Sequence, residues 1–338
     1  MEDIPQLRIH GVDDLRLDHV MAPECGPDDV VVKVKECGIC GTDLGFLKMG
    51  SLRGNQPMPI GHELWGEIHE AGSNVRSVDV GDRVVVHPMA GGNNIGNGGA
   101  EGGFTPLLLV RGVANDSGCL ISLGDKLPLE YGALVEPLAV GQHGANRIEA
   151  SPADKVVIYG AGPIGLSLLT VLAYRGLEDI VVVDLSDARL EQAASMGAVA
   201  LRADDPALTE KLVELHGDNP FFGMPMPATT VYFEATGVRA VFERIIEIAG
   251  PRSRVCLMGV HKESAEVDLV MLLAKEVSLV PAMGYEQEFD EVIAMLESGR
   301  VDPTAIVTHQ YPLSAVQDAF AMAKDTSQAI KVLVDCQS

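Results

Sequence analysis

The sequence predicts an α/β protein in which a β-rich domain is joined to a doubly wound parallel sheet covered by helices. The length of 338 residues is more than one hydrophobic core usually holds, so two domains are expected. Residues 1 to about 140 contain short valine-rich segments and few helical patterns. From Lys155 onward strands and helices alternate, which is typical of a parallel sheet with helices on both faces.

The first domain is expected to begin with extended segments. Residues 30–35 are rich in valine and lead directly to Cys37, and residues 83–86 follow a Gly-Asp turn. Residues 90–103 consist largely of glycine and asparagine, with little that could enter a core. They are either a flexible connection or a lid that orders over a bound ligand.

The second domain is expected from regularly spaced strands and helices. Strands are predicted over residues 155–159, 180–183, 229–233 and 254–258, and helices over residues 163–174, 187–196 and about 239–249. Three prolines interrupt residues 217–228, which indicates a surface loop or an interface. A helix over 286–299 and a strand over 330–334 return to the first domain, so the expected domains are 1–145 with 285–338, and 146–284.

A glycine-rich turn predicts dinucleotide binding by the second domain. It reads Gly160-Ala-Gly162-Pro163-Ile164-Gly165, follows a predicted strand and opens a predicted helix, as in the Rossmann fold. Gly160 permits the tight turn, Gly162 lets the backbone approach the pyrophosphate, and Gly165 lets the helix pack on the strand. Pro163 and Ile164 begin the helix, whose N-terminus attracts phosphate. A glycine turn without a ligand is the alternative.

An acidic residue at the end of the next strand predicts NAD as the cofactor. Asp184 stands where a carboxylate binds the ribose hydroxyls and repels the 2′-phosphate of NADP. Arg189 is nearby on the following helix, but the acidic Asp187 stands between them. We therefore expect Asp184 and Arg189 to join the glycine turn in binding NAD.

Three separated fragments predict a zinc site. They contain Cys37 and Cys40, then His62-Glu63, then Glu136, and together they supply the thiolate, imidazole and carboxylate groups that zinc accepts. Glu136 lies within an apolar segment, where a buried carboxylate needs either an ion-pair partner or a metal. The C-x-x-C pair could instead be a redox pair, or both thiolates could bind zinc. A metal that acidifies a hydroxyl and a nicotinamide that accepts a hydride indicate alcohol oxidation.

At these residues the chain resembles the zinc-dependent medium-chain dehydrogenase/reductase superfamily over nearly its whole length. Among its members, the chain is most similar to the polyol branch of sorbitol, idonate and butanediol dehydrogenases. Glu136-Pro-Leu stands where classical alcohol dehydrogenases use a cysteine, and residues 288–293 and 329–332 also point to this branch. The shared motifs, in the family's order, are Gly-Ile-Cys40-Gly-Thr42-Asp43, Gly61-His62-Glu63, Gly81-Asp82-Arg83-Val84, Gly102-Gly103-Phe104, Glu136-Pro137-Leu138 and the glycine turn.

The resemblance implies roles for individual residues. Cys40 and His62 are the implied zinc ligands, and Glu63 or Glu136 completes the coordination sphere. Cys37 is then a neighbour, and the Thr42 hydroxyl relays the substrate proton. The resemblance also implies a GroES-like catalytic domain, a Rossmann domain, and assembly into homodimers or homotetramers.

The chain departs from the family pattern in two places. Many relatives carry four closely spaced cysteines for a structural zinc, but residues 88–101 contain none, so we expect one catalytic zinc per subunit and no structural zinc. Relatives also often have a histidine where this chain has Gly45, so the proton is expected to leave through water or another group. Phe46, Leu47, Trp65 and Glu136 are candidates for the substrate pocket.

The expected reaction is the zinc-dependent, NAD-linked oxidation of a secondary alcohol to a ketone, with a polyol, sugar acid or vicinal diol as substrate. An L-threonine 3-dehydrogenase-like enzyme and a non-catalytic NAD-binding sensor are the alternatives.

The net charge of −23 disfavours nucleic acid and anionic membranes as partners. Because apolar runs of about 18 residues and a recognisable signal segment are missing, we expect a cytoplasmic protein.

Overall fold

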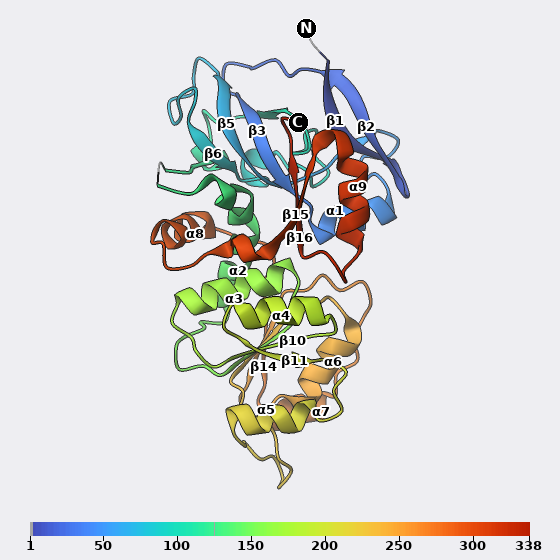
Figure 1. The fold of residues 1–338 in the computed structure, drawn as a ribbon, viewed down its shortest axis with the longest axis vertical. Helices are drawn as coiled ribbons and strands as arrows, with labels where there is room; N and C mark the ends of the chain where they lie inside the picture. Colours follow the sequence, from blue (N-terminus) through green and yellow to red (C-terminus); the bar gives the residue numbers. More distant parts are fainter. Residues whose placement is uncertain (1–2, 125) are drawn as a thin grey trace. The chain divides into compact units, whose positions relative to one another are not determined.

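A computed structural model describes residues 3–124 and 126–338 (Figure 1). Contacts between residues group the chain into two units. Unit 1 contains the chain up to Glu136 together with Val307–Ser338, and unit 2 contains Pro137–Ile306. The mixture of a separate β-rich unit and a parallel-sheet unit with helices confirms the predicted fold class.

The unit boundaries differ from the domain boundaries expected from the sequence because of two helices, α2 (Val135–Arg147) and α8 (Glu288–Glu297). His143 Nδ1 of α2 lies 2.7 Å from Glu288 Oε1 of α8, and Asn146 Nδ2 donates to Glu291 Oε2 at 3.2 Å. These polar contacts, one buried and one exposed, tie α8 to α2, so both helices belong mainly to unit 2.

Unit 1 is built from two sheets and a few short helices. The larger sheet has the order β15-β16-β3-β5-β6-β8, with β7 also paired to β3, and the smaller one has the order β2-β1-β4. The strands are β1 (Asp3–Gly11), β2 (Asp14–Met21), β3 (Val30–Gly38), β4 (Met58–Pro59), β5 (Glu63–Ala71), β6 (Arg83–Val86), β7 (Leu107–Val110), β8 (Leu120–Ser122), β15 (Val307–Pro312) and β16 (Lys331–Asp335). The helices are α1 (Gly41–Met49), α9 (Val316–Lys324), and the 3-10 turns η1 (Ala90–Gly92), η2 (Ser117–Cys119), η3 (Leu129–Leu134) and η5 (Leu313–Ala315).

The register of the larger sheet brings the predicted metal ligands toward one another. β3 and β5 are antiparallel, with Gly38 at the end of β3 opposite Glu63 at the start of β5. On the other side of β3, Leu333 of β16 is also opposite Gly38. The turn that carries Cys40 therefore leaves the sheet beside the first residue of β5 and the first residues of β16.

Unit 2 is a six-stranded parallel sheet in the order β11-β10-β9-β12-β13-β14. This is the doubly wound order, in which the direction of winding reverses between β9 and β12. The strands are β9 (Val156–Tyr159), β10 (Ile180–Asp184), β11 (Val199–Arg202), β12 (Val231–Glu234), β13 (Arg254–Leu257) and β14 (Ser278–Pro281). The remaining helices are α3 (Pro163–Tyr174), α4 (Asp187–Ser195), α5 (Leu208–His216), α6 (Arg239–Ile248), α7 (Leu269–Lys275) and the 3-10 turn η4 (Pro303–Ile306).

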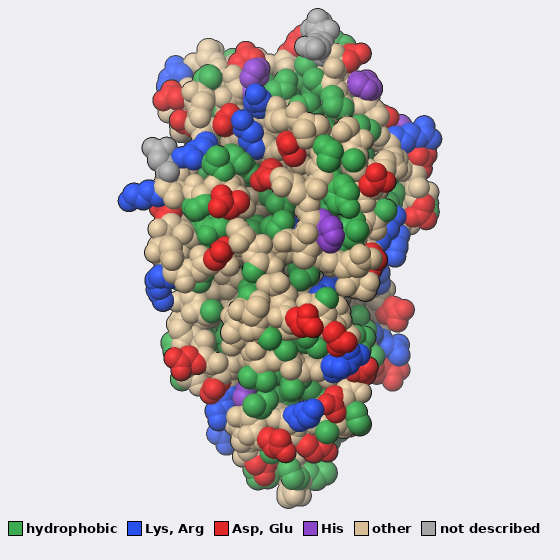
Figure 2. Space-filling model, in the orientation of Figure 1, with side chains coloured by type: hydrophobic (Ala, Val, Ile, Leu, Met, Phe, Trp, Pro, Cys, Tyr) green, Lys and Arg blue, Asp and Glu red, His purple; other side chains and the backbone are tan. Residues whose placement is uncertain are grey.

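The surface carries the charge that the composition predicts. Figure 2 shows acidic side chains scattered over the visible face, with lysines and arginines among them. Among the described residues, none of the helices is both long and apolar enough to cross a membrane.

The two loops left open by the sequence have different structures. Residues 90–103 form a tightly hydrogen-bonded loop in which Ile95 is fully buried and Gly96 N donates to Glu101 O at 2.8 Å. Residues 217–228 form no helix, as the prolines predict, and contain two isolated β-bridges. Phe222 at the tip of this second loop is 86% exposed.

Candidate active site

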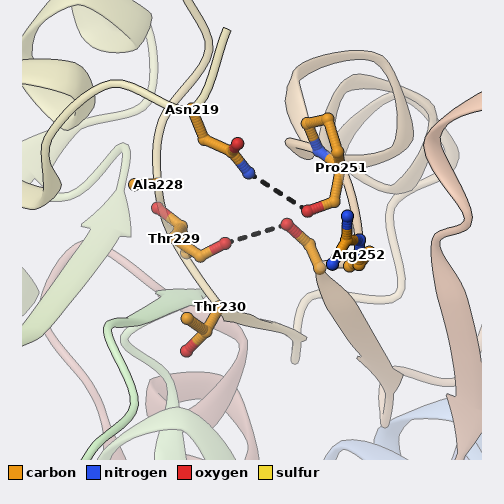
Figure 3. A pocket seen from close by; sticks show the side chains of 7 residues that line it. Asn219, Ala228, Thr229, Thr230, Pro251 and Arg252 are labelled. Carbon is orange, nitrogen blue, oxygen red and sulfur yellow. Dashed lines mark hydrogen bonds between the residues drawn. The ribbon is translucent and has the colours of Figure 1, made fainter. Parts of the chain in front are cut away.

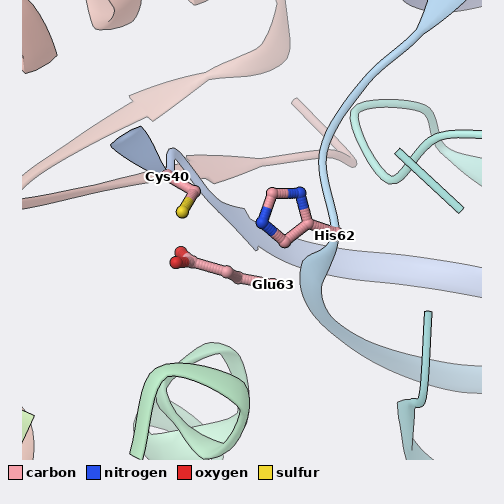
Figure 4. A group of neighbouring side chains, drawn as sticks. All are labelled: Cys40, His62 and Glu63. Atoms are coloured by element: carbon pink, nitrogen blue, oxygen red, sulfur yellow. The ribbon is translucent and has the colours of Figure 1, made fainter. Parts of the chain in front are cut away.

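Cys40, His62 and Glu63 form the candidate metal centre of unit 1 (Figure 4). Each offers one ligand atom, and these atoms all lie within 4.8 Å of one another. Cys40 precedes the first residue of α1, His62 precedes β5, and Glu63 begins β5. A thiolate, an imidazole and a carboxylate that converge in this way fit the donor set of a catalytic zinc site.

Asp43 links the turns that carry Cys40 and His62. This fully buried carboxylate accepts hydrogen bonds from Cys40 N at 2.9 Å and from Gly61 N at 3.1 Å, so it joins the two ligand-bearing turns. His62 Nδ1 lies 3.6 Å from Asp43 Oδ1, which is an ionic contact but too long for a hydrogen bond. Burial by itself lowers the pKa of His62, but interactions with Asp43 and Cys40 raise it, and the net result lies well above the usual value.

Lys331 neutralises Glu63. Both residues are buried, and Lys331 Nζ donates to Glu63 Oε1 at 2.8 Å and to Oε2 at 2.5 Å. The same ammonium group donates to Ile39 O at 3.1 Å. Burial lowers the pKa of Lys331, whereas the neighbouring charges of Glu63, Cys40 and Glu136 raise it, and the net shift is upward. The lysine therefore stays charged and compensates the carboxylate of the candidate metal centre.

Lys331 is the functional residue that the sequence analysis missed. It is the first residue of β16 and is followed by Val332, Leu333 and Val334. A charged residue that opens an apolar segment such as Val332–Val334 needs a buried partner if its side chain enters the core, and the same argument applies to Glu136. That signal could have identified Lys331, although it could not have named Glu63 as the partner.

Glu136 lies near this centre but outside the compact ligand group. It is 6% exposed in the first turn of α2, and its charge helps to raise the pKa of Lys331. Among the described residues, the ligand atoms that converge within 4.8 Å belong to Cys40, His62 and Glu63.

The remaining sequence candidates in unit 1 have different surroundings. Cys37 is fully buried, and burial raises the pKa of its thiol well above the usual value, which disfavours the thiolate form that a metal ligand needs. Thr42 is half-buried in the first turn of α1, and Phe46 is half-buried one turn further on. Leu47 belongs to the hydrophobic core. Trp65 is buried and donates to Glu36 Oε2 at 2.9 Å.

The glycine-rich loop of residues 90–103 packs directly behind the turn that carries His62. Gly103 N donates to Gly61 O at 2.8 Å. A Cβ atom on Gly96 would lie 2.2 Å from Gly61 O, and one on Gly102 would lie 2.5 Å from Ile60 N. The glycines therefore allow a close backbone approach that supports the metal-binding turn, rather than forming a mobile lid.

In unit 2 the glycine turn has the geometry of a dinucleotide site. Gly160 follows β9 with φ at +105°, and a Cβ atom on Gly165 would lie 1.8 Å from Gly160 O. Gly162 precedes α3, with Pro163 and Ile164 in its first turn, so the first backbone N–H groups of this helix are available to phosphate.

Asp184 and Arg189 both lie at this turn. Asp184 Oδ2 accepts from Ala161 N at 2.7 Å, and Oδ1 accepts from Ser186 N at 2.9 Å. A guanidinium nitrogen of Arg189 lies 3.6 Å from the position that a Cβ atom would take on Gly162. Burial lowers the pKa of Arg189, and the charge of Asp184 opposes that shift. The structure thus brings together the residues for which the sequence predicts cofactor binding, and their role in binding stays a prediction.

A hollow of about 370 Å³ lies at the opposite edge of this sheet, before β12 and β13 (Figure 3). Its lining includes Asn219, whose Nδ2 donates to Pro251 O at 3.1 Å, and Ser253, whose Oγ donates to Thr229 O at 2.8 Å. The hollow is distinct from the glycine turn, which lies at the carboxyl ends of the strands.

Comparison with known proteins gives the family. The family described as alcohol dehydrogenase GroES-like domain matches residues 26–120, and the family described as zinc-binding dehydrogenase matches residues 163–298. The (R,R)-butanediol dehydrogenase of Bacillus subtilis is 31% identical over 97% of this chain and 98% of its own length. The sorbitol dehydrogenase of Ovis aries is 32% identical over 98% of this chain and 96% of its own length.

Solved structures agree with this relationship. An alcohol dehydrogenase from Escherichia coli CFT073, determined in complex with NADH, has a TM-score of 0.86 and 26% identity, and the match covers 99% of this chain and 100% of that one. These matches span both units, and they confirm an oxidoreductase that uses zinc and a nicotinamide cofactor on a small alcohol. The chain therefore belongs to the zinc-dependent medium-chain dehydrogenase/reductase family, on its polyol dehydrogenase branch.

Proposed function

We propose that this enzyme oxidises a polyol or vicinal diol at a secondary hydroxyl, with NAD as the hydride acceptor and one zinc ion per subunit. The observation that carries the proposal is the convergence of Cys40, His62 and Glu63 beside a buried lysine. The relatives that are 31% and 32% identical are named for butanediol and sorbitol, which both carry neighbouring hydroxyl groups.

Cys40 and His62 would hold the zinc ion, and Glu63 or Glu136 would complete its coordination. When bound, zinc supplies Lewis-acid activation of the substrate hydroxyl, and NAD supplies the hydride acceptor. Asp43 would hold the turns of Cys40 and His62 together through Cys40 N and Gly61 N. Lys331 binds both oxygens of Glu63, so any movement of Glu63 toward the metal weakens part of this ion pair.

The Thr42 hydroxyl would carry the substrate proton away from the site. Thr42 is two residues after Cys40, and as a half-buried side chain it can contact both the site and solvent. Gly45 offers no side chain to continue this relay, so water would receive the proton from Thr42.

A single zinc ion is supported by the way the loop of residues 90–103 is held. Asn93 Nδ2 donates to Arg111 O at 3.0 Å, and Arg111 N donates back to Asn93 Oδ1 at 3.1 Å. Gly91 N donates to Asp116 Oδ2 at 3.1 Å. Hydrogen bonds of amide and carboxylate groups thus stabilise a segment that contains no cysteine ligands for a structural zinc.

NAD rather than NADP is supported by Asp184. Its carboxylate lies at the end of β10 beside the glycine turn, where it would repel a 2′-phosphate.

A homodimer or homotetramer is the proposed assembly. Leu269, Val270 and Leu273 of α7 are exposed, and β14 is an edge strand of the parallel sheet. Exposed apolar side chains beside an unpaired edge favour pairing with a second copy. A single monomeric species in sedimentation velocity would refute this assembly.

The proposed location is the cytoplasm, because all six cysteines are free thiols.

The experiment that tests the metal mechanism is the substitution Cys40→Ser. Removing the thiolate should lower the zinc content to near zero and reduce turnover by at least about 100-fold, whereas the affinity for NAD should stay unchanged because unit 2 carries the dinucleotide residues. Zinc content, turnover and NAD affinity would be measured on the same preparation. Cys25→Ser changes another free cysteine and serves as the control. Undiminished turnover by zinc-free Cys40→Ser protein would refute the proposal.

A further inference from the structure

The two halves of the parallel sheet divide the work of dinucleotide binding. The half that contains β9 and β10 carries the glycine turn and Asp184, so it takes the adenosine side. In a doubly wound sheet the other half, β12 to β14, takes the second mononucleotide. The loops after β12 and β13 therefore lie on the side of the sheet where the nicotinamide nucleoside would bind.

A buried carboxylate joins these two loops. Glu234 is the last residue of β12 and is fully buried. Its Oε1 accepts hydrogen bonds from Thr236 N at 2.8 Å, from Gly237 N at 3.0 Å and from the Thr236 hydroxyl. Its Oε2 lies 2.8 Å from Nε2 of His261, which follows β13. One carboxylate thus fixes the loop after β12 and also anchors the loop after β13.

Close backbone contacts show that the loops are packed against each other and against the glycine turn. A Cβ atom on Gly259 would lie 2.2 Å from Gly237 N and 2.4 Å from Glu234 Oε2. A Cβ atom on Gly160 would lie 3.0 Å from Thr236 Cγ2. A shift of His261 would therefore pass to Gly237 and Thr236 in the loop after β12.

His261 is held on its other side by an apolar contact. Its ring meets the ring of Phe242 of α6 edge to face, with centroids 5.9 Å apart, and the side chain is 15% exposed. The histidine therefore has a fixed position, with its Nε2 directed at Glu234.

We propose that Glu234 and His261 form a positioning pair that sets the shape of the nicotinamide side of the dinucleotide site. The pair acts through the loops that it holds and does not itself contact the reacting atoms. This inference rests on the proposed function, because it requires that unit 2 binds NAD.

The test compares NAD with ADP-ribose, which lacks the nicotinamide, by calorimetric titration of the zinc-loaded enzyme. His261→Ala should raise the dissociation constant for NAD about tenfold, the effect of losing one hydrogen bond to a charged group, and leave that for ADP-ribose unchanged. His261→Gln should restore NAD binding, since its amide nitrogen can donate to Glu234. Glu234→Gln gives a second variant with the side-chain volume preserved, and it should show the same selective loss.

A matched control lies at the other end of β12. His216 is also buried, and its Nδ1 lies 2.8 Å from the Oγ1 atom of Thr229, which precedes β12 and lines the hollow in Figure 3. His216→Ala should lower the melting temperature but leave both dissociation constants unchanged.

Two results would overturn the positioning pair. In the first, His261→Ala and Glu234→Gln raise the dissociation constants for NAD and for ADP-ribose by the same factor. In the second, both variants bind NAD as tightly as the unsubstituted enzyme does. If the unsubstituted enzyme binds neither ligand, the proposed function itself fails, and the positioning pair fails with it.

Discussion

At the scale of single residues, the candidate metal centre depends on two buried carboxylates with different partners. Asp43 is satisfied by backbone N–H groups and lies beside His62, so it fixes the positions of the ligands. Glu63 is satisfied by Lys331, so it is both a potential ligand and half of an ion pair. A buried charge that loses its partner strongly destabilises the folded protein. Substitution of Lys331 should therefore show directly whether the ion pair with Glu63 stabilises the site.

Lys331→Met should destabilise the zinc-free protein by about 3–5 kcal/mol, because Glu63 is left as an uncompensated buried charge. Urea denaturation of zinc-free protein measures this loss. Adding Glu63→Gln to Lys331→Met should recover part of it, since the charge is then removed. Lys48→Met replaces an exposed lysine of α1 and serves as the control. A Lys331→Met protein as stable as the parent would contradict the role assigned to this lysine.

Asp184→Asn should relax the preference for NAD over NADP. The asparagine oxygen can still accept the hydrogen bond from Ala161 N, whereas the bond from Ser186 N and the charge that repels a 2′-phosphate are both lost. We expect the ratio of kcat/KM for NAD to that for NADP to fall about tenfold, which corresponds to roughly 1.4 kcal/mol of lost discrimination. An unchanged ratio would show that Asp184 does not select the cofactor.

At the scale of elements, the loop of residues 90–103 supports the metal-binding turn through close backbone packing. Gly92 and Gly96 both have positive φ, at +72° and +66°, but their surroundings differ. A Cβ atom on Gly96 would collide with the backbone of Gly61, whereas a Cβ atom on Gly92 would meet nothing within 4 Å.

Gly96→Ala should therefore displace Gly61 and its neighbour His62, and it should weaken zinc binding at least about tenfold. Gly92→Ala carries similar backbone strain of about 1–2 kcal/mol but should leave zinc affinity unchanged. Competition with a chromophoric zinc chelator measures both affinities. Equal zinc affinities in the two variants would show that the loop does not position His62.

Some helices and loops could be predicted from the sequence, and others could not. The helix expected over 163–174 is found at Pro163–Tyr174, because Pro163 and the strand before it define where it begins. The helix α8, however, joins unit 2 through Glu288 and Glu291, and such contacts between distant segments leave no local pattern. The ordered packing of residues 90–103 was also missed, since glycines that permit close approach look the same in a sequence as glycines that confer flexibility.

At the scale of the whole molecule, family and chemistry were predictable because the ligand residues occur in short motifs. Cys40, His62 and Glu63 come together as expected. The ion pair of Glu63 with Lys331 joins residues that are 268 positions apart in the sequence, so no local pattern predicts it. The candidate metal ligands lie in unit 1 and the predicted dinucleotide residues in unit 2, so the proposed reaction needs both units. Substrate choice depends on pocket shape, which the motifs do not encode.

The most direct test of the account is NADH formation, followed by absorbance, over a panel of polyols, sugar acids, vicinal diols and threonine, each with and without a zinc chelator. The account predicts turnover of a polyol or vicinal diol that is lost when zinc is removed and returns when zinc is restored. Turnover that persists in verified zinc-free enzyme, or no turnover of any alcohol by enzyme shown to hold zinc and NAD, would contradict it.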